Sequence, residues 1–212
     1  DSVGTFEGRL NFEEIEAFEG IICFTKGAGI LTETGYRPVE SLQIGDLVHT
    51  RDNGMQQIRW IGQRSVPGIG QLAPISFAPE ALEGATKPLI VSPQHRMLLT
   101  GYQSELLFGE TEVLVPAKYL VNGTTVREAP CAKVSYYHVM FDSHEVIYAD
   151  GQATESFHAG GEGLNAIAPE AREEMFAIFP ELRWNAGGHG DTARICLKSH
   201  EAQVLGQLRN AA

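Results

Sequence analysis

Cys23 is the residue in this sequence best suited to attack a carbonyl group. A thiolate is the strongest nucleophile among the common side chains, but an unperturbed thiol is mostly protonated at neutral pH. Cys23 opens a short glycine-rich stretch, 23–32, that leads into a strand-like segment. The next segment, 35–48, carries no cluster of catalytic side chains and is interpreted as scaffold. A working Cys23 therefore needs a base or an acid from elsewhere in the chain.

Two later stretches could supply these partners. Ser92 and His95 lie three residues apart in a turn after an apolar strand, so both side chains could face one peptide group. An imidazole can protonate an amide nitrogen, and a hydroxyl can hydrogen-bond the same group. Asp142 and His144 are two residues apart and would share a face of an extended strand, where the carboxylate could orient the imidazole or raise its pKa. Either pair could instead have a purely structural role: His95 as a hydrogen-bonded residue beside a strand, and Asp142 and His144 as a solvent-facing turn at a strand end.

The remaining cysteines and histidines have no motif around them. Cys131 and Cys196 are interpreted as packing residues, and an odd count of three cysteines argues against a disulfide framework. The other histidines are interpreted as structural or surface residues: His49, His138, His158, His189 and His200. No C-x-x-C or H-x-x-x-H spacing occurs, so we expect no metal site and no cofactor.

Composition and charge limit the class of protein. The 212 residues are 43% hydrophobic and 20% charged, which suits one globular domain or one domain with an appendage. The net charge of −11 argues against nucleic acid or an anionic membrane as partner, because binding phosphate requires clustered Lys and Arg. No apolar run reaches the roughly 18 residues that a membrane helix needs. The start at Asp1 carries no signal pattern and suggests a piece of a longer precursor.

Short apolar segments separated by turn residues predict a mostly β domain. The expected strands are 47–50, 57–61, 75–77, 89–91, 134–141 and 144–149. Asp52-Asn53-Gly54 predicts a hairpin turn between the first two strands, and Asp150-Gly151 predicts another turn. Residues 66–70 are expected to form a loop.

Beyond residue 158 the pattern changes to helical. Residues 169–179 have a proline in the first turn, acidic residues near the N-terminal end and an apolar stripe, and Pro180 ends the segment. Ser199 is expected to cap a last helix. Both helices are expected to cover an open edge or face of the β-domain. The chain is thereby divided into an upstream segment 1–22, a β-domain 23–158 and a helical extension 159–212.

Three stretches taken together resemble the Hint (hedgehog/intein) superfamily. They are the segment 23–46, Ser92-Pro93-Gln94-His95, where Thr-x-x-His is usual, and the segment 141–146. Four further segments of this chain resemble a bacterial, intein-like branch of the superfamily: 51–54, 58–62, 92–99 and 155–157. Domains of that branch occur at the C-terminal end of large, often secreted proteins. The resemblance implies a horseshoe-like, pseudo-twofold β fold, here with two short C-terminal helices, and a secreted or cell-surface bacterial precursor.

The resemblance also implies self-processing by an N-to-S acyl shift. The thiol of Cys23 would attack the carbonyl carbon of Ile22 and convert that peptide bond into a thioester. His95 would protonate the departing nitrogen, and Ser92 would polarise or hold the scissile group. Water, a small thiol or amine, or a protein nucleophile would then take the upstream polypeptide, which is the partner in cis.

The same resemblance assigns Asp142 or His144 to adjusting the protonation of the thiol. Inteins end in a His-Asn pair that drives cleavage on the C-terminal side. The corresponding stretch 150–158 has no such pair, so full splicing is not expected. Ala28 and Ile22 stand where relatives often carry Thr and Pro, and both are departures at the reacting end. Two other functions remain open: an inactive Hint scaffold that serves as a binding module, and a cysteine protease acting in trans.

Overall fold

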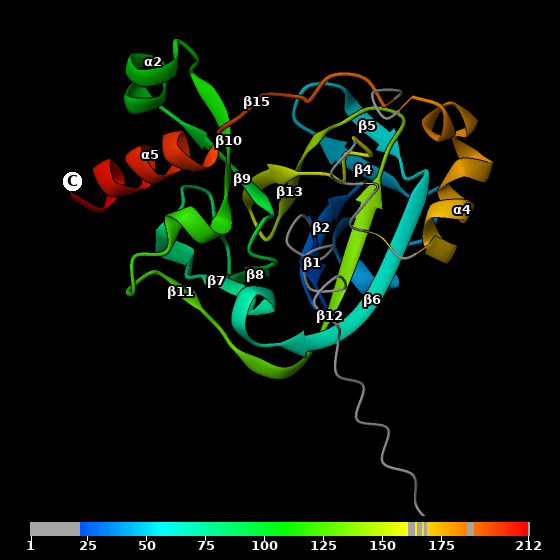
Figure 1. Cartoon of the computed structure of the whole chain (residues 1–212), viewed down its shortest axis with the longest axis horizontal. Helices are drawn as coiled ribbons and strands as arrows, with labels where there is room; N and C mark the ends of the chain where they lie inside the picture. The colour runs from blue at the N-terminus through cyan, green and yellow to red at the C-terminus, as the bar shows by residue number, and fades with distance from the viewer. Residues whose placement is uncertain (1–21, 161–163, 165–166, 168, 186–188, 212) are drawn as a thin grey trace, which may run out of the picture.

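The computed structural model describes residues 22–160, 164, 167, 169–185 and 189–211. Within these ranges the chain is mostly β, as predicted, with strands in two sheets (Figure 1). Its α-helices are α2 (Tyr102–Phe108), α4 (Pro169–Ile178) and α5 (Ser199–Ala211). None of the described helices is long and apolar enough to cross a membrane. The predicted upstream segment, except Ile22, lies outside the described residues.

The first sheet places the chain's reactive end at its centre. Its six strands are ordered β11 (Val126–Glu128), β7 (Ile75–Phe77), β8 (Leu89–Val91), β1 (Phe24–Thr25), β12 (Cys131–Met140) and β6 (Trp60–Gly68). Strand β1 pairs antiparallel with both neighbours, so Phe24 lies opposite Val91 on β8 and Tyr137 on β12. Cys23 immediately precedes β1 and therefore lies between the ends of two longer strands.

The second sheet carries the turn motifs and one edge formed by the extension. Its order is β15 (Ile195–Cys196), β10 (Glu112–Pro116), β9 (Arg96–Thr100), β14 (Gln152–Glu155), β13 (Val146–Ala149), β2 (Gly29–Thr32), β4 (Leu47–Thr50) and β5 (Gly54–Gln57), with β3 (Gly35–Pro38) paired to β2. Short 3-10 helices lie between the elements of both sheets and after α4: η1 (Val39–Ser41), η2 (Gly70–Leu72), η3 (Pro79–Ala81), η4 (Ala117–Leu120) and η5 (Pro180–Arg183).

Both predicted turns are confirmed. Thr50 pairs with Gly54 at the β4–β5 hairpin, where Gly54 has φ of 65°. Asp150 and Gly151 have φ of 51° and 86° in the turn between β13 and β14. A Cβ at Gly151 would lie 2.0 Å from the carbonyl oxygen of Gly84, so glycine is needed there for close approach as well as conformation.

Several predicted boundaries are wrong for identifiable reasons. The loop expected at 66–70 is strand as far as Gly68, because β6 is an edge strand and tolerates Pro67. The strand expected at 57–61 is divided between the end of β5 and the start of β6. The strand expected at 134–141 begins earlier, at Cys131, and α2 was not predicted.

The helical extension is attached at two places. Both predicted helices, α4 and α5, are confirmed, and Figure 1 shows them on opposite sides of the molecule. Helix α5 packs against η4, and a Cβ at Gly206 would lie 2.2 Å from the carbonyl oxygen of Tyr119. A strand, not a helix, covers the β10 edge, because β15 pairs parallel with β10.

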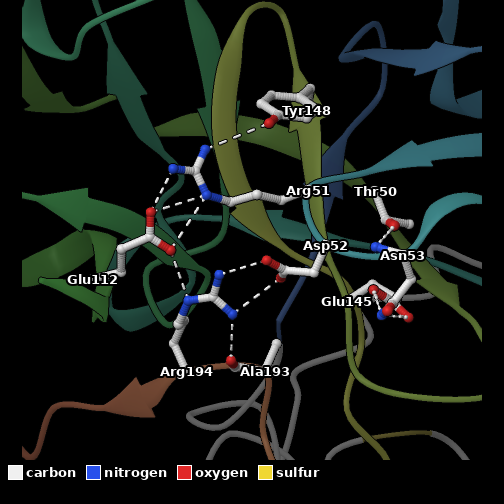
Figure 2. A network of polar contacts seen from close by, with 9 residues as sticks. All are labelled: Thr50, Arg51, Asp52, Asn53, Glu112, Glu145, Tyr148, Ala193 and Arg194. Atoms are coloured by element: carbon white, nitrogen blue, oxygen red, sulfur yellow. Dashed lines mark hydrogen bonds and ion pairs between the residues drawn. The ribbon is translucent and has the colours of Figure 1, made fainter. Parts of the chain in front are cut away.

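A polar network fastens the start of β15 to the rest of the second sheet (Figure 2). Arg194 binds Asp52 through Nη2 at 2.7 Å and Glu112 through Nε at 2.7 Å. Arg51, next to Asp52 in the hairpin turn, also binds Glu112 and lies 3.4 Å from the Tyr148 hydroxyl. Two guanidinium groups thus share one carboxylate at the surface.

Candidate functional site

The peptide group between Ile22 and Cys23 is held at both of its polar ends. Nδ1 of His138 lies 2.8 Å from the Ile22 carbonyl oxygen, and because a carbonyl only accepts, Nδ1 carries the proton. The Cys23 amide N–H donates to Ser92 Oγ at 3.0 Å. Backbone bonds fix the second contact, since the Ser92 amide donates to the Cys23 carbonyl at 3.0 Å. One side chain from β12 and one from the turn after β8 therefore bind the same peptide group.

The thiol of Cys23 is completely buried, with 0% of the residue exposed. Its Sγ lies 3.5 Å from both ring nitrogens of His138. Burial raises the pKa of the thiol well above its ordinary value, and a side-chain hydrogen bond from Ser92 offsets only part of that effect. The thiol is therefore neutral at rest and needs a base to become nucleophilic.

His138 is the candidate site residue that sequence reasoning missed. It was interpreted as structural or surface, but it lies in β12, 5% exposed, against both the thiol of Cys23 and the carbonyl of Ile22. Its ring stacks on Trp60 at 6.0 Å and meets Phe157 edge-on at 4.9 Å. Burial lowers the pKa of His138 to about 4, although its bond to the Ile22 carbonyl opposes that shift. The available signal was a histidine inside the apolar run predicted as the longest strand.

His95 is held in one tautomer by Thr154. The Thr154 hydroxyl donates to the carbonyl of Arg96 at 2.9 Å, so it can only accept the hydrogen bond that it shares with His95 Nε2. The proton of neutral His95 therefore lies on Nε2. Nδ1 is buried, has no hydrogen-bond partner and carries the lone pair. Burial lowers the pKa of His95 to about 4, so the ring is neutral at rest.

The turn before β9 fixes the backbone of His95 relative to that of Ser92. The His95 amide donates to the Ser92 carbonyl at 3.1 Å, which closes the turn. The His95 ring meets the ring of Phe24, the residue after Cys23, at 4.5 Å. Ser92 and His138 therefore contact Cys23 or its peptide group directly, whereas His95 borders Cys23 through Phe24.

Asp142 and His144 are not brought to the thiol, which corrects the roles expected for them. The Asp142 side chain is 67% exposed and pairs with Arg59 at 3.1 Å. His144 is buried, but its Nε2 lies 3.3 Å from Glu155 Oε2 and its Nδ1 accepts the Ala193 amide at 3.0 Å. Strand β12 ends at Met140, so these residues follow a bend and do not share the face of an extended strand.

Glu155 and Arg96 form a second buried cluster with His144. Nη1 of Arg96 lies 3.1 Å from Glu155 Oε2, and the Arg96 amide donates to Oε1 at 2.7 Å. Burial alone would raise the pKa of Glu155, but the charge of Arg96 and the contact with His144 hold it below its ordinary value. This carboxylate is therefore ionised and has a structural ion-pair partner.

The other cysteines lie apart from this arrangement. Across the described residues Cys23, Cys131 and Cys196 are all free thiols, and the last two are half-buried. No group of three or more His, Cys, Asp or Glu side chains in the described ranges is arranged to hold a metal ion. The thiol and the imidazoles at the site can carry out nucleophilic attack and proton transfer.

The family of the chain follows from comparison with known domains. A model of the Hint domain matches residues 22–161, which is more than half of the 212 residues. The chain therefore belongs to the Hint domain family. The matched region begins at Ile22, the residue whose carbonyl His138 contacts.

Solved structures that the chain is similar to include two from named organisms. A bacterial intein-like domain from Clostridium thermocellum is 14% identical, with a TM-score of 0.45 over 64% of this chain and 99% of that one. A DnaB intein from Synechocystis sp. is 5% identical, with a TM-score of 0.42 over 63% and 97%. No curated protein sequence matches the chain. The family assignment rests on the Hint match.

Proposed function

We propose that this Hint domain converts the Ile22–Cys23 peptide bond into a thioester by an N-to-S acyl shift and so releases or transfers the polypeptide upstream. The observation that carries the proposal is the double contact on one peptide group. His138 binds its carbonyl oxygen, Ser92 binds its amide N–H, and the nucleophile belongs to the same residue as that amide. Nucleophile and electrophile are then positioned before any reaction begins.

His138 supports two tasks through its two ring nitrogens. With the proton on Nδ1, the lone pair of Nε2 is 3.5 Å from Cys23 Sγ and can accept the thiol proton. As Sγ bonds to the Ile22 carbonyl carbon, negative charge develops on the oxygen that Nδ1–H already contacts. Protonation of Nε2 makes the ring a cation at that moment and strengthens the second interaction.

His95 is suited to the second half of the step. The C–N bond can break only if the Cys23 nitrogen gains a proton and leaves as an amine. His95 can deliver that proton from Nδ1, once Nδ1 has acquired one, because Thr154 occupies Nε2. The thiol loses one proton and the amine gains one, so the isomerisation balances when the two histidines re-equilibrate with solvent.

The thioester would then be resolved by water, a small thiol or amine, or a protein nucleophile. A thioester lies above an amide in free energy, so the acyl shift alone can reverse. Resolving the thioester in this second step removes the upstream polypeptide and makes the process irreversible. Cleavage on the C-terminal side is not part of the proposal. The stretch 150–158 contains no Asn that could cyclise. Its buried Glu155 accepts from the Arg96 amide, and its buried Ser156 accepts from the Glu145 amide.

An inactive scaffold is the second candidate, and one observation favours it. Cys23 is 0% exposed with a raised pKa, so the acceptor must reach the thioester through some opening of the structure. The same burial argues against a protease acting in trans, because an external chain would have to reach that thiol.

Mass spectrometry of a fusion with a reporter before Asp1 tests the proposal. The acyl shift itself changes no mass, so the protein is incubated with and without dithiothreitol to resolve the thioester. We expect a thiol-accelerated reporter fragment ending at Ile22 in the parent and in Cys131→Ala, and none in Cys23→Ala. Equal cleavage in Cys23→Ala would reject the mechanism, and no cleavage in the parent would favour the scaffold.

A further inference from the structure

The side chain of Ile22 shares an apolar cluster with residues that lie beyond the Hint match. Ile22 is 6% exposed and belongs to a closed apolar cluster. The strand-domain members of this cluster are Trp60, Met140, Phe157 and Ala159. The members after residue 161, where the family match ends, are Leu164, Ile167, Met175, Phe179 and Leu182. The extension therefore supplies about as much of this environment as the Hint domain itself.

Helix α4 has one buried face, and that face joins this cluster. Met175 is 0% exposed, whereas Glu173 and Glu174 beside it are exposed. After α4 the chain turns through η5, which adds Leu182, and Phe179 lies between the two elements. Figure 1 shows α4 on the side of the molecule where β6 runs, far from α5. The two helices of the extension therefore have different tasks, and only α4 borders the reacting end.

A buried histidine fastens this part of the extension to the site strand. Nε2 of His189 donates to the carbonyl of Phe141, directly after β12, at 2.9 Å. Its Nδ1 accepts the amide of Ala159 at 3.2 Å. The ring also meets Phe179 edge-on at 6.1 Å. These contacts hold the apolar face of α4 and η5 against the strand that carries His138.

We infer that α4 and η5 complete a binding pocket for the side chain at position 22 and so determine which acyl residue the domain accepts. The inference rests on the proposed function and adds its substrate class, an upstream polypeptide ending in a medium-sized aliphatic residue. A charged side chain would be buried without a partner, a larger ring would overpack the cluster, and a smaller residue would leave a cavity. The same wall keeps water away from the carbonyl carbon of Ile22.

Cleavage rates of the reporter fusion test the pocket when residue 22 and its wall are changed together. In the parent, Ile22→Val should cleave nearly as fast, and Ile22→Phe should be slower by roughly tenfold or more. Met175→Ala makes room, so it should reduce the Ile-to-Phe rate ratio several-fold. The control Leu205→Ala removes a buried α5 side chain from the central core and should leave that ratio unchanged. An unchanged ratio in Met175→Ala would overturn the inference.

Unfolding in urea gives a second test that does not depend on cleavage. In the Cys23→Ala background, Ile22→Ala and Met175→Ala are combined in a double-mutant cycle, with Leu205→Ala as the distant partner. Non-additive midpoint shifts for the first pair and additive shifts for the second support a shared pocket. Additive shifts for both pairs contradict it. A parent that never cleaves but shows coupling at position 22 would reject the proposed function and leave the pocket standing.

Discussion

Two buried polar groups lie on opposite faces of the same pair of strands. His95 directly precedes β9, which begins at Arg96, and Thr154 and Glu155 are successive residues of β14. Successive side chains of a strand point to opposite faces, so the pairs separate. His95 bonds to Thr154 on one face, and Arg96 binds Glu155 on the other.

The difference between the two faces concerns charge. On the His95 face burial lowers the pKa of His95 and of His138 to about 4, and Nδ1 of His95 has no partner. On the other face Arg96 holds the pKa of Glu155 down despite its burial, so the ions are paired. A buried neutral group with an unpaired lone pair is suited to proton transfer, whereas a paired ion is suited to a structural role. The pKa shift is downward on both faces, so what distinguishes them is the charge that results and the presence of a partner: neutral imidazoles on one face and an ionised, paired carboxylate on the other.

The largest contrast should come from removing one histidine from each face. His95→Ala should slow thiol-induced cleavage after Ile22 by roughly a hundredfold or more, because the leaving nitrogen loses its general acid. His144→Ala removes a partner of Glu155 and should leave the rate of the folded protein close to that of the parent. Single-turnover kinetics of the reporter fusion measure both. Equal losses in the two variants would erase the distinction between the faces.

Neutralising the charged face should affect stability instead of rate. Glu155→Gln takes the fully buried carboxylate away from the half-buried Arg96 guanidinium, which should lower the free energy of unfolding by about 3 kcal/mol, more than a hundredfold in the equilibrium. The matched control is Glu173→Gln, whose partner Arg183 is exposed, and its cost should stay below about 1 kcal/mol. Urea unfolding followed by circular dichroism compares them. Equal costs would mean that the Glu155 cluster is not a buried ion pair in solution.

The residues of the site that could be predicted from the sequence are those in a compact motif. Cys23 follows from its chemistry and its glycine-rich turn, and Ser92 and His95 from a spacing that one turn fixes. His138 is separated from Cys23 by 115 positions and reaches it only because β1 pairs with β12, with Phe24 opposite Tyr137. Local pattern carries no information on that pairing, since register between distant strands is set by the assembled core.

The same limit explains the misplaced Asp142–His144 pair. Alternation along a strand was the basis for their shared face, but the strand ends at Met140 and the chain bends. Prediction was better where local physics dominates, as in the β4–β5 hairpin with its Asn53-Gly54 turn and in the α4 helix between Pro169 and Pro180. It failed at Pro67, because only the finished sheet makes β6 an edge strand.

Thr154 tests whether the tautomer of His95 matters on the reactive face. Thr154→Val removes the acceptor for Nε2–H at nearly constant volume and should slow cleavage by roughly ten- to a hundredfold, the range found when partners that orient a histidine are removed. Thr154→Ser keeps the hydroxyl and should recover most of the rate. Nitrogen-15 shifts of the His95 ring report the tautomer directly. A parent with the proton on Nδ1, or a valine variant with unchanged shifts and rate, would contradict this role.

The pH dependence of cleavage tests the protonation of His95 without a mutation. Because burial lowers the pKa of His95 to about 4, roughly one molecule in a thousand carries the Nδ1 proton at pH 7. If that proton limits the acyl shift, the rate should rise about tenfold per pH unit between pH 7.5 and 5.5. Limitation by ionisation of the thiol, whose pKa burial raises, would give the opposite slope.

The acidic end of that profile needs a stability control, and its sign follows from the same shifts. His95 and His138 have pKa values of about 4 in the folded chain against 6.5 when unperturbed, so the unfolded chain binds more protons below pH 6.5. The stability that the two neutral histidines contribute is fully present above pH 6.5 and is lost as the pH falls toward 4. The unfolding midpoint should therefore fall across the range in which cleavage accelerates. A rate that rises while the midpoint falls, with the protein still folded, assigns the acceleration to the reactive face and not to greater stability.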